Sequence, residues 1–363
     1  MQADPIRAPA RAQDLTLRHR VKDYRAGDLE RRFTTLGIHE DVFVNYGFVS
    51  SAVEALMHPR GLVSRWPPRR RQRAHLLLEF VRERGSVHPR EVDRHFSHGR
   101  VTNYWGGSSS ATTHLMELMH YGGLLRVVRR EAGIRIYALH ERGDSLDARK
   151  LDAIASSEGG RIDALVDVAV RKYAPVPAAT LSYLVRRLRY AAPQWHGELG
   201  NALQRARHRL AHAQVDGIDW YWPAGERPSR PRRRDDREDA VRLLAPFDPI
   251  VWDRQRFELL WGWQYRFEAY TPAAKRKLGY YELPLLWRDH VIGWANLSMK
   301  NGELQSDVGY VSARPPRDRT FGRALEAELD RMRFFLGAEG NSGISADIEA
   351  LVKDAVSTGR RRR

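Results

Sequence analysis

Two side chains that can act on water lie two residues apart at the beginning of the chain, Gln2 and Asp4. Pro5 disfavours helical backbone at the preceding residue, so Asp4 is expected to be extended. In extended backbone, alternate side chains point the same way, and Gln2 and Asp4 could then hold one water between an amide and a carboxylate. Arg7 and Arg11 add positive charge nearby and are expected to hold phosphate groups, although either could equally belong to the exposed surface. The structural alternative is that Asp4 caps a helix that starts at Pro5, and short motifs often arise by chance.

Composition restricts the class of protein. A chain of 363 residues with 42% hydrophobic residues is long enough for two to four domains with cores of their own. It has no cysteine, which excludes disulfides, thiolate zinc sites, iron–sulfur clusters and a cysteine nucleophile. No apolar run approaches the length of a membrane span and the N-terminus lacks the apolar core of a secretory signal, so we expect a cytoplasmic protein that avoids membranes.

The charge indicates a polyanionic partner. The formal net charge is +16 and the isoelectric point is about 10.3. Nearly all of the positive charge is arginine, which suits bidentate contacts with phosphates and base edges, although a genome rich in G and C would also favour arginine. Nucleic acid is therefore the expected partner.

A proline-stiffened basic segment, residues 65–73, marks the first internal boundary. It includes Arg69, Arg70 and Arg71, which either contact phosphate or belong to a solvated linker. The segment stands directly before a region that resembles a DNA-binding module. We therefore include the three arginines among the expected DNA contacts.

The pattern that follows is typical of a winged helix. Apolar periodicity predicts helices over 72–85 and 89–96, and a third helix from Ser110 to Gly122. Residues 124–130 and 134–139 then form a predicted hairpin across a turn, with Arg129 and Arg130 in its basic arm. Three helices followed by a hairpin are the order of a winged helix-turn-helix, whose hairpin we expect to contact DNA.

The same order repeats further along the chain. Helices are predicted over 161–173, 177–188 and 197–212, and an Asp216-Gly217 turn joins a hairpin that ends at Trp222. Arginines are frequent in these helices. Arg186 and Arg187 are taken as DNA contacts, although a single arginine is more often part of a solvated face.

The last third of the chain changes character after the linker at 227–236. Strand-like segments at 265–270, 280–286 and 291–298 predict a mainly antiparallel sheet or small barrel, closed by a helix over 319–336. The fold class is thus α+β, with tandem winged helices and a C-terminal β-rich domain. We expect domains at 1–68, 69–157, 158–226 and 238–337, then a frayed tail at 338–363.

Two long blocks, residues 243–254 and 268–284, carry a resemblance to a known family. Together with Tyr104-Trp105-Gly106-Gly107-Ser108, they make the chain similar to the bacterial AlkZ/YcaQ-type DNA glycosylases over nearly its whole length. The resemblance implies winged helices, a β-rich C-terminal domain and action on DNA. In the second block, Lys275, Arg276 and Lys277 form a basic triplet that we expect to contact DNA.

The same resemblance gives the opening motif a role. The family signature is Gln, an apolar residue, then Gln or Asp, and Gln2-Ala3-Asp4 matches its Asp-bearing, YcaQ-like branch. That branch implies removal of N7-alkylated purines and unhooking of interstrand crosslinks. The chain departs from the pattern twice: no helices precede the motif, so the first domain is expected to be incomplete, and Asn45-Tyr46-Gly47-Phe48 lacks a histidine usual in the family.

An N7-alkylated purine is already a charged leaving group, so the expected chemistry is hydrolysis by a water that Asp4 activates and Gln2 orients. Lysines are few and none is near the motif in sequence, which favours a monofunctional hydrolase. His95 and His98, or His208 and His212, have helical spacing but lack further ligands, so we expect no metal and no cofactor. The expected partner is double-stranded DNA in the bacterial nucleoid, bound by a monomer. The alternatives are a non-catalytic winged-helix DNA-binding protein or regulator, and an RNA-binding protein.

Overall fold

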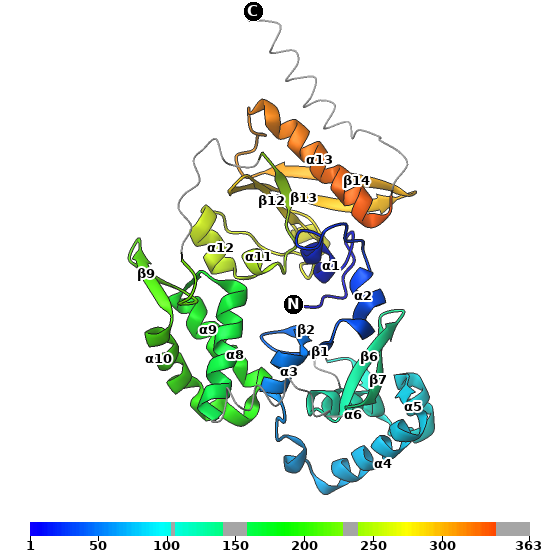
Figure 1. Ribbon diagram of the computed structural model, residues 1–363. Helices are drawn as coiled ribbons and strands as arrows, with labels where there is room; N and C mark the ends of the chain where they lie inside the picture. The colour runs from blue at the N-terminus through cyan, green and yellow to red at the C-terminus, as the bar shows by residue number, and fades with distance from the viewer. Residues whose placement is uncertain (103–105, 141–157, 228–238, 339–363) are drawn as a thin grey trace, which may run out of the picture. The chain divides into compact units, whose positions relative to one another are not determined.

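The computed structural model describes residues 1–102, 106–140, 158–227 and 239–338 (Figure 1). The predicted linker at 227–236 lies almost wholly outside these residues, as do the tail after residue 338 and Tyr104-Trp105. The described residues form two compact units. The first unit contains Met1–Gln2 and Glu30–Glu226, and the second contains Ala3–Leu29 and the chain from Arg227. The four predicted domains stay a prediction.

The first unit contains a hairpin of β1 (Ile38–Val42) and β2 (Tyr46–Ser50), which was not predicted from the sequence. A helix, α3 (Ser51–Met57), follows directly, because Ser50 is extended and its hydroxyl accepts from the backbone N–H of Val53. Short segments precede this hairpin, with α2 (Asp28–Arg32) at the boundary between the units and a 3₁₀ turn, η1 (Phe33–Thr35). A second 3₁₀ turn, η2 (Val63–Arg65), follows α3 in the chain.

The first predicted group of three helices and a hairpin is confirmed as secondary structure. Its helices are α4 (Pro68–Arg84), α5 (Pro89–Phe96) and α6 (Ala111–Tyr121), and its hairpin is β6 (Leu125–Glu131) with β7 (Ile134–Leu139). Proline opens both α4 and α5, and Ser110 caps α6. A short β3 (Ser86–Val87) extends the sheet in the order β3-β7-β6, while β4 (Arg100–Thr102) pairs separately with β5 (Ser108–Ser110). One core cluster, which includes Leu77, Val81, Met116 and Leu125, joins the helices to this sheet.

The second predicted group is confirmed in the same sense. It consists of α8 (Glu158–Tyr173), α9 (Ala178–Ala191) and α10 (Leu199–Arg209), followed by β9 (Ala211–Val215) and β10 (Ile218–Trp222). The chain turns at Asp216 and Gly217, both with positive φ, as the predicted hairpin turn requires. A two-residue β8 (Val176–Pro177) completes a sheet in the order β8-β10-β9, and η3 (Pro193–Glu198) precedes α10.

The second unit contains one antiparallel sheet and the helices that cover it. Its strands are β11 (Val241–Leu243), β12 (Leu283–Trp287), β13 (His290–Lys300) and β14 (Glu303–Tyr310), paired in chain order. The helix α13 (Arg319–Leu336) matches its prediction and lies along the sheet (Figure 1). Three short helices, α1 (Ala12–Leu17), α11 (Pro249–Trp252) and α12 (Arg254–Trp261), complete the unit. The sheet is open within the described residues, so the barrel alternative is not seen there.

The predicted strand over 265–270 is wrong. This segment belongs to an irregular loop that leads through η5 (Ala273–Lys275) to β12. Its backbone is bound by acidic side chains: the Glu282 carboxylate accepts from the N–H of Glu268, and the Glu268 carboxylate accepts from the N–H groups of Lys277 and Leu278. Within 265–270, the N–H of Glu268 is therefore satisfied by a carboxylate and not by a neighbouring strand.

Helix α1 is held in the second unit by buried ionic contacts just beyond its C-terminus. Arg18 pairs with Glu328 of α13, which is fully buried and also accepts from the backbone N–H of Leu243. Arg18 and His19 both bond to the carbonyl of Leu243, at 3.1 and 2.9 Å. Arg20 makes two bonds of 2.7 and 2.9 Å with the buried Asp248. These contacts fix the segment that leads back to Asp4.

We expect Glu328→Gln to lower the free energy of unfolding by about 3 kcal/mol, because it leaves the buried Arg18 without its counter-charge. Chemical denaturation would measure the change. Asp330→Asn on the same helix is the control, since Asp330 is exposed and pairs only at the surface; its effect should stay below about 0.5 kcal/mol. Equal effects of the two substitutions would show that the buried pair does not anchor α1.

Candidate functional site

The first two residues lie beside β2. The amino group of Met1 donates to the carbonyl of Phe48 at 2.6 Å, the N–H of Phe48 donates to the carbonyl of Met1 at 2.7 Å, and Gln2 forms an antiparallel bridge with Gly47. Gly47 permits this pairing, because a Cβ built there would lie 1.9 Å from the Met1 carbonyl oxygen. The glycine in Asn45-Tyr46-Gly47-Phe48 thus creates the space in which Gln2 is held.

Gln2 has an unused hydrogen-bonding group. Its side-chain oxygen is buried and has no partner in the described part of the chain. The first unit also brings an amine near this segment: Lys172, at the end of α8, acts on the Met1 amino group. Burial and then the Lys172 charge lower the pKa of that amino group to about 4. The prediction that no lysine lies near the motif is therefore wrong. Lys172 is distant from the motif in sequence but acts on Met1, the residue before Gln2, in the fold.

Asp4 lies in the second unit and is 5% exposed. Its carboxylate accepts from the N–H of Ile6 at 2.7 Å, and its own N–H donates to the side chain of Gln13 in α1 at 3.2 Å. Burial raises the pKa of Asp4, although the Ile6 hydrogen bond opposes the shift. No helix begins at Pro5, so the helix-cap explanation of Asp4 is wrong; its carboxylate instead bonds to the backbone two residues ahead. A raised pKa makes the ionised carboxylate a stronger base.

The predicted DNA contacts differ in their exposure. Several are exposed at the surface of their own unit: Arg7, Arg69, Arg70, Arg71, Arg129, Arg186, Lys275 and Lys277. Arg69, Arg70 and Arg71 occupy the first turn of α4, where the helix dipole disfavours cations. A bound anion would offset that repulsion, so a phosphate contact is a physical reason for three arginines at this end of the helix.

Other members of the predicted set serve the fold. Arg130 makes two hydrogen bonds, at 2.6 and 2.7 Å, to the buried carboxylate of Glu40 in β1. Arg187 donates to the carbonyl of Val44 at 2.7 Å and to the side chain of Asn45 at 2.9 Å. Arg11 is 8% exposed. These arginines order the β1–β2 hairpin and the region around α1, and less of their guanidinium surface is open to a ligand.

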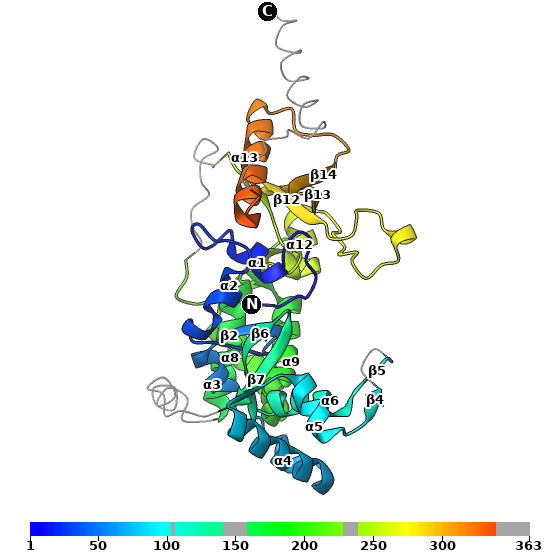
Figure 2. The ribbon, with the colours of Figure 1, turned by 90° about the vertical axis from the view of Figure 1, so that its right-hand side faces the viewer.

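The basic triplet lies in the loop between α12 and β12, shown in yellow in Figure 2. The loop returns to the sheet at Leu278, whose carbonyl accepts from the side chains of Trp294 and Asn296 at 2.9 and 2.7 Å. Arg276 lies over the ring of Tyr280, with its guanidinium carbon 4.9 Å from the ring centroid. Tyr270 is 72% exposed, the most exposed of the large hydrophobic side chains described. Exposed cations and aromatic rings in a fixed loop suit contact with nucleic acid.

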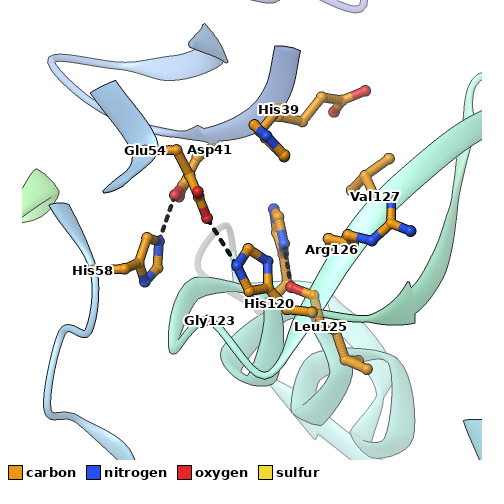
Figure 3. A pocket seen from close by; sticks show the side chains of 11 residues that line it. His39, Asp41, Glu54, His58, His120, Gly123, Leu125, Arg126 and Val127 are labelled. Carbon is orange, nitrogen blue, oxygen red and sulfur yellow. Dashed lines mark hydrogen bonds and ion pairs between the residues drawn. The ribbon is translucent and has the colours of Figure 1, made fainter. Parts of the chain in front are cut away.

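Inside the first unit, a small pocket contains histidines and acids that the sequence analysis did not identify. Asp41 accepts from His58 at 2.8 Å and from Arg60 at 2.9 Å, and His140 pairs with Glu54 at 3.1 Å. Figure 3 shows Asp41 turned toward His58, and His120 turned toward the carbonyl of Leu125. The cavity is about 10 Å³, enough for about one water. It is too small for a nucleotide, so this network stabilises the first unit.

The buried charges of this network keep Asp41 ionised. Burial favours the neutral acid, but the hydrogen bond from His58 and the charge of Arg60 outweigh it and lower the pKa of Asp41. Arg60, 1% exposed, also donates to the carbonyls of Val42, Tyr121 and Ala191. The described residues contain no group of three or more potential ligands placed to hold a metal ion. None of the described helices is both long and apolar enough to cross a membrane.

The sequence analysis missed Gly47, Glu40 and Asp41 as positioning residues. A lone glycine in an aromatic segment has many explanations, and adjacent acids are usually solvated. The sequence offered one signal for the two acids: Glu40 and Asp41 interrupt an otherwise strand-like stretch that ends at Phe48. Acids in such a stretch need partners if the strand is buried, which predicts arginine or histidine nearby but not which one.

We expect Gly47→Ala to displace Met1 and Gln2 from β2, since the added Cβ overlaps the Met1 carbonyl. Hydrogen exchange of the peptides containing Gln2 and Phe48 should become faster, and the melting temperature should fall. Gly200→Ala in α10 is the matched control: an added Cβ there would have no atom within 4 Å, and alanine favours a helix. Unchanged exchange in Gly47→Ala would contradict the assigned role.

The protein-family model described as "DNA glycosylase AlkZ-like" matches residues 1–335 of the chain. The match includes the N-terminal motif, both helix-and-hairpin groups and the sheet of the second unit. No solved structure matches.

Proposed function

The chain belongs to the AlkZ-like DNA glycosylase family, and we propose that it removes N7-alkylated purines from double-stranded DNA by hydrolysis. The observation that carries the proposal is Asp4, a buried carboxylate with a raised pKa in the family's Gln-x-Asp motif. The family acts on DNA as a glycosylase. The lesion, the catalytic residues and the water mechanism are our inference.

The proposed reaction balances with water alone. The oxygen of water bonds to C1′ of the damaged nucleotide, the C1′–N9 bond breaks, and its electron pair neutralises the cationic purine. Asp4 takes the proton of the water and, while ionised, stabilises positive charge on the sugar. Gln2 orients the water with its unpartnered side-chain oxygen. The products are a free alkylpurine and an abasic site.

Water, not an amine, is the proposed nucleophile, so the enzyme is monofunctional. An N7-alkylated purine leaves readily because departure removes its charge, and an imine with the enzyme is unnecessary. Since Lys172 lies beside the Met1 amino group, this point needs its own test. With borohydride present, wild-type protein is expected to release base without forming a covalent adduct with DNA; an adduct lost in Lys172→Ala would overturn the proposal.

We further propose that the two groups of helices and hairpin act as winged helices on DNA. The exposed arginines of α4, Arg186 of α9 and the triplet Lys275, Arg276 and Lys277 would neutralise phosphates. Gln2-Ala3-Asp4 matches the Asp-bearing branch of the family, whose resemblance implies unhooking of crosslinks, so we include interstrand crosslinks among the proposed substrates. The proposed setting is the bacterial nucleoid, where the protein acts as a monomer.

We expect Asp4→Asn to lower the single-turnover rate of N7-methylguanine release from a duplex by about 100-fold or more, because the amide cannot accept the proton. The asparagine oxygen can still accept from Ile6, so the fold should persist, as circular dichroism would show. Gln13→Ala is the comparison: it removes a contact with the Asp4 backbone without removing the carboxylate and should cost less. Equal, slow release by wild type and Asp4→Asn would favour a non-catalytic DNA-binding protein.

Replacing Arg69, Arg70 and Arg71 by Gln should weaken binding to undamaged duplex and reduce the salt dependence of log K by roughly 2–3, near 0.9 for each lost phosphate contact. Fluorescence anisotropy at several salt concentrations would measure the slope. In the control, Arg82 and Arg84 become Gln at the other end of α4, where both already pair with glutamates. A triple variant with the control's slope would exclude this turn from the interface.

A further inference from the structure

Tyr281 has a buried hydroxyl group that the proposed reaction does not use. Its side chain is 2% exposed, and its hydroxyl group has no hydrogen-bond partner within the described part of the chain. A buried hydroxyl without a partner costs free energy, and proteins nearly always satisfy such groups with protein or water. A bound water is the simplest solution where a second polar group faces the same space.

The Tyr281 ring is held rigidly. It packs edge-on against Phe267, with the ring centroids 5.1 Å apart. The next residue is fixed as well: the carbonyl of Glu282 accepts from the Tyr265 hydroxyl at 2.8 Å, and its carboxylate accepts from the N–H of Glu268 at 2.9 Å. Tyr281 therefore cannot readily turn its hydroxyl toward solvent, and the group must be satisfied where it lies.

Asp4, a carboxylate that is 5% exposed, belongs to the same unit and is the charged side chain that acts most strongly on Tyr281. After burial, the charge of Asp4 is the strongest influence that raises the pKa of Tyr281, and it acts on Tyr270 as well. Arg254 acts in the opposite direction and more weakly. Tyr281 thus stays protonated near a buried carboxylate, and its hydroxyl is available to donate a hydrogen bond.

We propose that the Tyr281 hydroxyl and the Asp4 carboxylate hold one buried water between them, and that this water attacks C1′. The proposal rests on the glycosylase function proposed above and assigns a second group to the same site. The water accepts a hydrogen bond from Tyr281 and donates one to Asp4, which leaves a lone pair for the sugar. As its proton passes to Asp4 and its oxygen bonds to C1′, the Tyr281 hydrogen bond holds the oxygen in line.

The second unit contains a matched control. Tyr310, the last residue of β14, also has a buried hydroxyl without a partner in the described chain, and burial, with no contribution from Asp4, raises its pKa to about 12. Tyr281→Phe and Tyr310→Phe each remove one buried hydroxyl and keep the ring. A general effect on folding should appear in both variants, whereas an effect on the attacking water should appear only in Tyr281→Phe.

The test measures single-turnover release of N7-methylguanine and the Kd for the same duplex. Tyr281→Phe should slow release roughly tenfold or more with an unchanged Kd, and Tyr310→Phe should match wild type in both. Because both groups bind one water, adding Tyr281→Phe to Asp4→Asn should slow release further by less than about twofold.

Two results would overturn the inference. One is wild-type release by Tyr281→Phe; the other is a multiplicative loss in the double variant, which would mean that Tyr281 acts apart from Asp4. If Asp4→Asn abolishes release and Tyr281→Phe does not, the glycosylase function stands and only the role of Tyr281 fails. If wild type itself releases no base faster than Asp4→Asn, the proposed function fails first.

Discussion

The buried carboxylate of Glu328 is the contact on which the second unit depends. It accepts from the Leu243 backbone at the edge of the sheet and pairs with Arg18 after α1, so one side chain of α13 joins a strand to the segment that leads to Asp4. Burial favours the neutral acid, but the charge of Arg18 and the hydrogen bond from Leu243 outweigh it and lower the pKa of Glu328. Removing any partner would leave a charge without compensation in the interior.

The two long blocks that carry the family resemblance can be explained physically. In the first, Asp248 is fully buried, pairs with Arg20 and caps α11. In the second, Glu268 and Glu282 bind backbone N–H groups, and burial raises the pKa of Glu282 to about 7. These acids act mainly on the chain and not on DNA. The blocks therefore stabilise the second unit, and the second block also contains Tyr281, whose buried hydroxyl has no partner within the described residues.

Local signals predicted much of the fold. Apolar periodicity and end signals gave α6 and α13 nearly to the residue, because capping and burial are encoded within each segment. The helix α4 begins at Pro68, inside the segment that was predicted as a boundary, and not at residue 72. The predicted strand at 265–270 is wrong: aromatic alternation is a local signal, and it does not contain the Glu282 carboxylate that accepts from the N–H of Glu268. The motif predicted Gln2 and Asp4 as site residues, whereas Gly47 and Lys172 became relevant only through contacts with Met1 and Gln2 across tens of residues or more. No spacing rule contains that information.

Net charge alone overstates the DNA-binding surface. Arg18, Arg60, Arg130, Arg161 and Arg187 all donate to carbonyls or carboxylates within their own units, where planar guanidinium groups satisfy several acceptors at once. Such arginines raise the net charge of the chain, but their guanidinium groups are largely occupied by contacts within the fold and offer little charge to a ligand. The first turn of α4 differs, since its arginines are exposed and oppose the helix dipole. These arginines destabilise the helix, and their own helix turn contains no carboxylate. An external anion is therefore the simplest reason for arginine at these positions.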